Sequence, residues 1–176
     1  KEAFEILRKK KNLRIIKILN LKKFEKGSQQ NIITMPDIFL AQSSDISSIN
    51  KKNLKLVSKR KPTSREIDDL IFANKIVKHV RSNAIVLAKN RVTLGIGSGN
   101  TRRVDSVNFA IQKSSRANIK GKKNFLSGAV MASDGFFPFP DSIILAYKAG
   151  INSVIQPGGS VKDEIVIKEV NNKNIS

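Results

Sequence analysis

The chain has 176 residues, with 33 Lys and Arg against 14 Asp and Glu, which gives a formal net charge of +19, and it has no cysteine. The lack of cysteine excludes disulfides and thiolate metal sites, and a single histidine excludes a zinc site of the usual kind. The sequence shows neither a charged-then-apolar leader nor an apolar run long enough to span a membrane, so we expect a cytoplasmic protein with no membrane partner.

The basic charge is spread along the chain. Residues 1–61 carry 16 basic and 5 acidic residues, and residues 62–176 carry 17 and 9. The two short basic runs, 8–11 and 59–61, contain no aromatic side chain on which a nucleic-acid base could stack. A solvated surface is therefore the favoured interpretation, and a basic nucleic-acid-binding module is kept as the alternative.

The first part of the chain, residues 1–61, predicts one helix and several strands between polar loops. Phe4 and Leu7 lie on one face of a helix predicted over 2–10, whose basic end suits a helix C-terminus. Apolar runs predict three strands, over 13–19, 37–42 and 53–58.

Residues 62–176 predict strands that alternate with helices. Thr63 and Glu66 form a capping-box pattern at the start of a helix that ends near Lys78. Asn90 begins a tight turn between two strands, and Gly150 closes a later helix. The remaining predicted elements are strands over 82–89, 92–99, 128–133 and 152–160 and helices over 102–117, 142–150 and 161–170. This alternation indicates an α/β layered sheet, and a further strand is expected where the sequence stops.

Three loops that follow predicted strands carry residues suited to ligands: 97–103 (GSGNTRR), 133–141 (SDGFFPFPD) and 156–160 (QPGGS). Ligands of α/β sheets bind beyond the carboxyl ends of strands. The glycine spacing of the first loop does not match a dinucleotide fingerprint, so we interpret it as a turn that presents Arg102 and Arg103 to an anion. For QPGGS, a plain left-handed glycine turn and a ligand-facing loop both stay open.

Phenylalanine gathers in the second of these loops. Phe136, Phe137 and Phe139 are three of the nine in the chain, and Pro138 and Pro140 stiffen the segment around them. A buried hydrophobic corner is one interpretation, and we expect it for Phe137.

Three stretches resemble a known family when they are taken together and in order: VKHVRSNAIVLAKNRVTLGIGSGNTRRVDSV, GAVMASDGFFPFPDSI and INSVIQPGGSVKDEIVI. They are similar to the transformylase domain of bifunctional purine biosynthesis enzymes, in which phosphoribosylaminoimidazolecarboxamide formyltransferase is joined to IMP cyclohydrolase. The resemblance implies formyl transfer from 10-formyltetrahydrofolate to the 5-amino group of 5-aminoimidazole-4-carboxamide ribonucleotide. It also implies a cytidine-deaminase-like layered α/β sheet with flanking helices and no zinc, and a site at a homodimer interface.

The resemblance also implies roles for individual residues. Asn83 corresponds to the catalytic asparagine, with its amide near the developing oxyanion. Arg103 contacts the folate, whose anionic glutamyl tail needs a cation. Asp141 hydrogen-bonds the amino and ring N–H groups of the pterin. Ser82 and Asp134 match positions near which some members of the family bind a potassium ion.

The aromatic and glycine-rich loops complete the implied cleft. Phe136 and Phe139 form the walls for the imidazole carboxamide and the folate rings, and Pro138 fixes their orientation. The turn after the last predicted strand lines the same cleft with Gly158, Gly159 and Ser160.

The sequence departs from the family pattern at several positions. Asn100 replaces the usual Gln, Arg102 the usual Ser, and Gly135 the usual Ala. The family's catalytic pair lies in a K-H-x-x-P-x-G motif, which this sequence lacks, so Lys78-His79 is not that pair. For the only histidine, at a predicted helix end, a capping or exposed position is favoured over catalysis.

These features predict an incomplete enzyme. We expect residues 1–176 to be a single partial domain, the C-terminal part of the transformylase domain, truncated at both ends. Its first segment is 1–61, with strands and polar loops, and its ligand-binding segment is 62–176. We expect this chain by itself to be inactive, and a catalytically degenerate homologue is a further alternative.

Overall fold

The structure is a computed structural model that describes residues 2–17, 30–117 and 125–176. The chain separates into two compact units, Lys1–Ser47 and Ser48–Ser176. No helix among the described residues has the length and apolar character needed to cross a membrane.

The first unit contains a short helix and a two-stranded hairpin. Helix α1 covers Glu2–Leu7, so the predicted helix over 2–10 is confirmed but shorter. Strand β2, Ile38–Ser43, confirms the strand predicted over 37–42, and it pairs antiparallel with β1, Gln30–Met35, which the sequence pattern did not indicate. The predicted strand over 13–19 is wrong for residues 13–17, which form no regular element; residues 18–19 lie outside the described residues.

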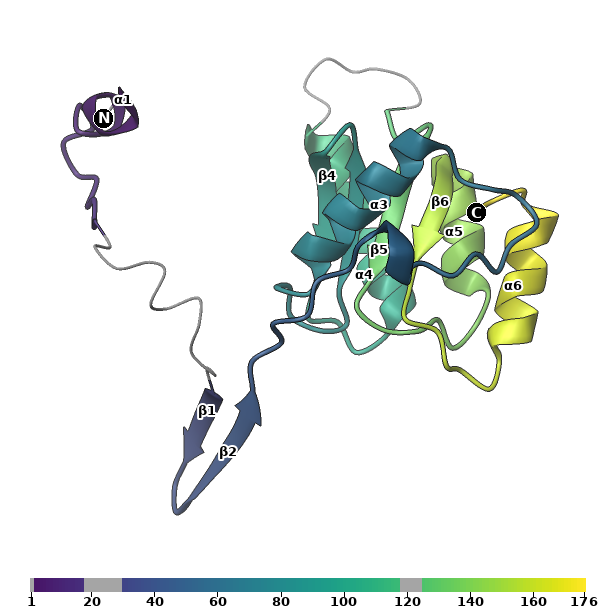
Figure 1. Cartoon of the computed structure of the whole chain (residues 1–176), viewed down its shortest axis with the longest axis horizontal. Helices are drawn as coiled ribbons and strands as arrows, with labels where there is room; N and C mark the ends of the chain where they lie inside the picture. Colours follow the sequence, from purple (N-terminus) through teal and green to yellow (C-terminus); the bar gives the residue numbers. More distant parts are fainter. Residues whose placement is uncertain (1, 18–29, 118–124) are drawn as a thin grey trace. The chain divides into compact units, whose positions relative to one another are not determined.

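The second unit is built on a four-stranded mixed sheet with the order β4-β3-β5-β6 (Figure 1). The strands are β3, Ile85–Lys89, β4, Val92–Gly97, β5, Ala129–Ser133, and β6, Ile151–Ile155. Strand β3 is antiparallel to both of its neighbours, and β5 is parallel to β6. Three strands, β4, β5 and β6, therefore run in one direction and β3 runs in the other.

Helices cover both faces of this sheet (Figure 1). A short 3₁₀ helix η1, Lys51–Asn53, precedes α3, Ser64–Val77, and the later helices are α4, Arg103–Ala117, α5, Asp141–Ala149, and α6, Asp163–Asn172. Alternate side chains of β3 point to opposite faces, as the pleat of a strand requires. Ile85 and Leu87 join the core with α4, α5 and α6, whereas Val86 and Ala88 join the core with α3. The unit is thus a three-layer α/β structure.

Local sequence signals account for several boundaries. The hydroxyl of Thr63 accepts from the backbone N–H of Glu66 at 3.2 Å, and the Glu66 carboxylate accepts from the N–H of Thr63 at 2.7 Å, so the capping box is confirmed. Asn90 and Arg91 both have positive φ, 53° and 55°, which is the turn geometry that suits a two-residue hairpin loop. Gly150, with φ 93°, ends α5 in the left-handed region.

The strand predicted over 53–58 is wrong. Residues 54–58 follow η1 without regular structure and pair with no strand of the sheet. Their backbone joins no β ladder. The side chain of Leu54 lies against the core on the α3 side, and Leu56 and Val57 line an apolar cavity of about 370 Å³. The end of the chain does meet the sheet, because the backbone of Ser176 donates to the Asn152 carbonyl and accepts from the N–H of Val154 on β6.

Candidate functional site

The topology brings four chain segments to one edge of the sheet. Because β4, β5 and β6 run in the same direction, their carboxyl ends lie at the same edge, and the antiparallel β3 begins there. The loops after residues 97, 133 and 155 therefore gather beside Asn83 and Ala84, which precede β3. This is the edge at which α/β sheets bind ligands.

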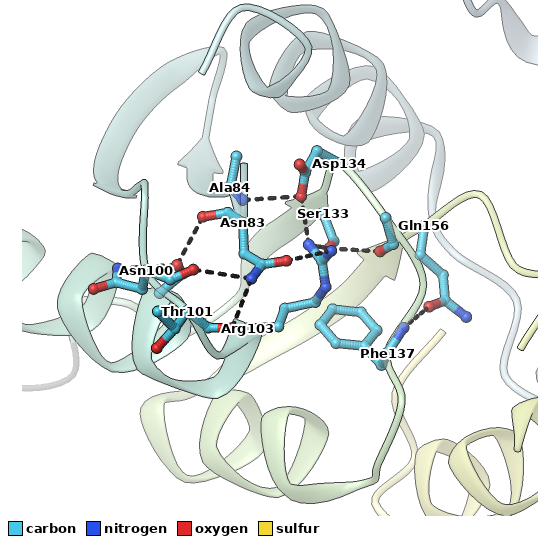
Figure 2. Close-up of polar contacts among 11 residues, drawn as sticks. Asn83, Ala84, Asn100, Thr101, Arg103, Ser133, Asp134, Phe137 and Gln156 are labelled. Carbon is cyan, nitrogen blue, oxygen red and sulfur yellow. Dashed lines mark hydrogen bonds and ion pairs between the residues drawn. The ribbon is translucent and has the colours of Figure 1, made fainter. Parts of the chain in front are cut away.

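The guanidinium of Arg103, the first residue of α4, joins three of these segments (Figure 2). Its Nη2 donates to Oδ1 of Asn83 at 2.9 Å, and its Nη1 donates to Oγ of Ser133 at 2.9 Å and to the carboxylate of Asp134. Only 11% of the Arg103 side chain and 17% of the Asp134 side chain are exposed, so the ion pair is largely shielded from solvent. Charge-assisted hydrogen bonds in such surroundings are strong and directional.

The amide of Asn83 has partners on both of its ends. Its Nδ2 donates to the carbonyl oxygens of Asn100 at 2.9 Å and Thr101 at 3.2 Å, while its Oδ1 accepts from Arg103 (Figure 2). The Ser106 hydroxyl donates to the backbone oxygen of Asn83 at 2.8 Å and lies 3.0 Å from Nδ2 of Asn100. The turn after β4 is therefore fastened to the start of β3 through Asn83.

Asp134 is an ionised acceptor at neutral pH. Burial by itself would raise the pKa of its carboxyl, but hydrogen bonds from Ser82, from the Ala84 N–H and from Arg103 outweigh it and leave the pKa below its ordinary value. The Ala84 N–H donates to Oδ1 at 2.9 Å. The described residues contain no group of three or more His, Cys, Asp or Glu side chains that could hold a metal ion.

The three phenylalanines separate as the sequence predicts. Phe137 is fully buried in the core, and its N–H donates to Oε1 of Gln156 at 2.8 Å, which ties the loop after β5 to the loop after β6 (Figure 2). Phe136 and Phe139 are 44% and 50% exposed. The ammonium of Lys162 lies 4.0 Å from the centroid of the Phe139 ring, a cation–π contact that the sequence did not indicate.

The remaining predicted residues surround these rings. Pro138 is half-buried, and Asp141 is exposed at the start of α5, where one of its oxygens accepts from the Ser142 N–H at 2.7 Å. Gly158 and Gly159 have φ of 71° and 95°, a backbone shape that favours glycine.

Two hydrogen bonds join the turn at residues 158–160 to the segment that begins α6. The N–H of Gly159 donates to the carboxylate of Asp163 at 2.7 Å, and the Ser160 hydroxyl accepts from the Lys162 N–H at 3.1 Å. Because the same Lys162 covers Phe139, the turn and the aromatic loop lie next to each other.

His79 is the only histidine of the sequence. It is exposed just after α3, and its backbone N–H donates to the Ile76 carbonyl at 3.0 Å, which agrees with the predicted exposed helix-end position. Ser106, Ser133, Gln156 and Lys162 were not predicted. Ser133 and Gln156 lie in loops that the sequence singled out, but the contacts of all four join residues distant in sequence, which no local motif indicates.

The fold and the site thus define an α/β protein with a polar cluster and two exposed aromatic rings at the carboxyl edge of its sheet. Residues 1–113 match the family model described as AICARFT/IMPCHase bienzyme. The chain belongs to this family.

Curated relatives match the whole chain. The bifunctional purine biosynthesis protein PurH of Persephonella marina is 45% identical over 177 residues, which cover 100% of this chain and 33% of that protein. The PurH proteins of Caldicellulosiruptor saccharolyticus and Aquifex aeolicus are 45% and 44% identical over 175 and 181 residues, and each match covers 99% of this chain and 32% of the relative. The chain spans about a third of the length of the curated relatives it matches.

Proposed function

We propose that this chain is part of a transformylase domain that transfers a formyl group from 10-formyltetrahydrofolate to the 5-amino group of 5-aminoimidazole-4-carboxamide ribonucleotide. The parent protein would also carry IMP cyclohydrolase activity, as the family and the bifunctional name of its relatives indicate. The observation that carries the proposal is the cluster of Asn83, Arg103 and Asp134 beside the exposed rings of Phe136 and Phe139, in a chain of this family.

The exposed rings suit two flat heteroaromatic ligands. Phe136 and Phe139 offer faces against which the imidazole carboxamide and the pterin can stack, and the prolines around them restrict the loop. Asp141 supplies an exposed carboxylate that accepts hydrogen bonds from the amino and ring N–H groups of the pterin. Gly158, Gly159 and Ser160 line the same cleft.

Asn83 would stabilise charge during the transfer. The substrate amine attacks the formyl carbon and loses a proton, and the carbonyl oxygen becomes an oxyanion. The folate nitrogen takes up a proton and leaves as the carbon–oxygen double bond re-forms. A positioned donor to such an oxyanion contributes about 3 kcal/mol. Because Nδ2 of Asn83 already donates to the carbonyls of Asn100 and Thr101, it must exchange one of these bonds to reach the oxyanion. The turn after β4 therefore adjusts when the ligands bind.

We propose that Arg103 serves the anionic folate side, for which it must exchange part of its pairing with Asp134. A proton acceptor is also needed, because the attacking amine loses a proton. No K-H-x-x-P-x-G motif is present in this sequence, so we assign the base to another part of the parent protein. The isolated chain should bind without turning over.

The wider setting follows from the same resemblance. We propose a cytidine-deaminase-like layered sheet without zinc for the complete domain, of which residues 1–176 are the C-terminal part, and a homodimer with the site at its interface. We also propose a cytoplasmic location, and small molecules rather than nucleic acid as partners. Potassium near Ser82 and Asp134 stays an expectation of the resemblance. Arg103 already neutralises Asp134, so we derive no step through the ion.

A direct assay tests the proposal. The full-length parent protein is supplied with the ribonucleotide and 10-formyltetrahydrofolate, and release of tetrahydrofolate is followed by absorbance. We expect turnover by the parent and none by this chain alone. A parent that forms no formylated product contradicts the proposed function, and turnover by the isolated chain contradicts the assignment of the base to another segment.

A further inference from the structure

Gly135 lies in close contact with the guanidinium of Arg103. A Cβ atom added at residue 135 would lie 2.6 Å from Nη2 and 3.3 Å from Cζ of Arg103. Favourable contacts between non-bonded heavy atoms need about 3.5–4.0 Å, so a methyl group at this position overlaps the guanidinium. Even the smallest side chain at residue 135 therefore forces Arg103 to move.

The need for glycine here is spatial and does not come from the backbone. Gly135 is absent from the positive-φ glycines of the described chain, so an L-residue can adopt its backbone conformation. This distinguishes it from Gly158 and Gly159, whose φ values of 71° and 95° lie in the left-handed region that favours glycine. The only cost of a side chain at residue 135 is the space that Arg103 now fills.

The guanidinium in this space holds the polar cluster together. It reaches Asn83, Ser133 and Asp134, which come from the start of β3 and the end of β5. The backbone of Gly135 takes part as well, because the Ser133 hydroxyl donates to the Gly135 carbonyl at 2.7 Å while accepting from Arg103. A shift of Arg103 by about 1 Å would lengthen its 2.9 Å bonds beyond hydrogen-bond range.

We propose that Gly135 is a positioning residue of this site: its missing side chain lets the Arg103 guanidinium insert between Asn83 and Asp134 and fix them before any ligand binds. The proposal concerns how the site is held and is independent of the ligand that the site takes. It can therefore be tested on this chain alone.

The test is a double-mutant cycle with Gly135→Ala, Arg103→Met and the two combined. Arg103→Met removes the guanidinium but keeps an unbranched apolar stem, so it leaves room for a methyl group at residue 135. Unfolding by urea is followed by far-UV circular dichroism. We expect Gly135→Ala to lower the urea midpoint of the unmodified chain and to leave the midpoint of the Arg103→Met chain unchanged. An equal decrease in both backgrounds overturns the proposal.

Two further observations keep the test decisive. If Gly135→Ala does not fold, the double variant should fold as Arg103→Met alone does, because the overlap is gone. A double variant that fails to fold while Arg103→Met folds contradicts the proposal. In NMR spectra, the guanidinium N–H signals of Arg103 should be dispersed and slow to exchange in the unmodified chain. In Gly135→Ala they should move to the positions of exposed arginines. Unchanged signals would show that the guanidinium does not depend on residue 135.

Discussion

Nη2 of Arg103 donates to Oδ1 of Asn83 at 2.9 Å, and this bond joins the first residue of α4 to the residue pair that precedes β3. The two residues are twenty positions apart in the sequence. Because the same guanidinium also pairs with Asp134, one side chain sets the relative positions of three segments at the carboxyl edge of the sheet.

Arg103→Met should destabilise the chain, because it leaves the carboxylate of Asp134 largely buried without its cation. Removing one member of a buried pair costs on the order of 3 kcal/mol. The matched control is Arg102→Met, since Arg102 is 73% exposed and its ion pair is with Asp105, three residues along the chain. Urea unfolding should separate the two variants, and an equal effect of both would contradict the role of Arg103.

Asp69→Asn should weaken the hairpin of β3 and β4. The buried carboxylate of Asp69 accepts from the backbone N–H of Asn90 at 2.9 Å and of Arg91 at 2.7 Å, one bond to each oxygen. An asparagine keeps one acceptor and turns an N–H₂ donor toward the other N–H, which should cost about 1–3 kcal/mol.

The neighbouring residue provides the control for this prediction. Asp68 carries the same charge but forms surface ion pairs with Lys51 and Arg91. Such exposed pairs contribute little to stability. Asp68→Asn should therefore leave the urea midpoint almost unchanged, and the assignment of Asp69 fails if the two variants behave alike.

Glu66 should make the free energy of unfolding depend on pH in the acid range. Burial alone would raise the pKa of Glu66, but hydrogen bonds from the Thr63 N–H and from Arg60 leave the pKa below its ordinary value of 4.5. A lowered folded-state pKa contributes stability above pH 4.5, and this contribution is lost as the pH falls through the folded value. Urea midpoints measured from pH 6 to pH 3 should decline less steeply for Glu66→Gln than for the unmodified chain. Parallel curves for the two proteins would argue against this role of Glu66.

Phe137→Ala should lower the stability of the chain, whereas Phe139→Ala should weaken folate binding. Phe137 is fully buried, so its truncation should cost about 3–5 kcal/mol. Phe139 is half exposed, so its truncation should leave the urea midpoint nearly unchanged and weaken folate binding in the parent protein. Calorimetric titration with a folate analogue measures the second effect. Full affinity in the Phe139 variant would remove this ring from the proposed cleft.

Asp141→Ala in the parent protein should raise the KM for the folate and leave the KM for the ribonucleotide unchanged. The reason is that the exposed carboxylate is proposed to accept only from the pterin N–H groups. Steady-state kinetics with each substrate varied in turn measures both constants. A folate KM equal to that of the unmodified parent would count against the pterin assignment.

Much of the second unit was predictable because its signals are local. The Thr63 and Glu66 capping box, the Asn90-Arg91 turn and the closing Gly150 each depend on residues within a few positions of one another. The burial of Phe137 was also predicted, as a hydrophobic corner in the proline-rich loop. The strand predicted over 53–58 failed because apolar alternation does not specify a pairing partner, and Leu54 packs on α3 instead.

The sequence by itself determined the helices and strands from Thr63 onward and the three loops that carry the candidate residues, because backbone propensity and hydrophobic period act over short distances. Only the tertiary structure decided that Arg103 reaches Asn83, Ser133 and Asp134, and that Gly135 leaves the space for it. Those contacts join residues about twenty to thirty positions apart, and they form only when the antiparallel β3 is placed between β4 and β5.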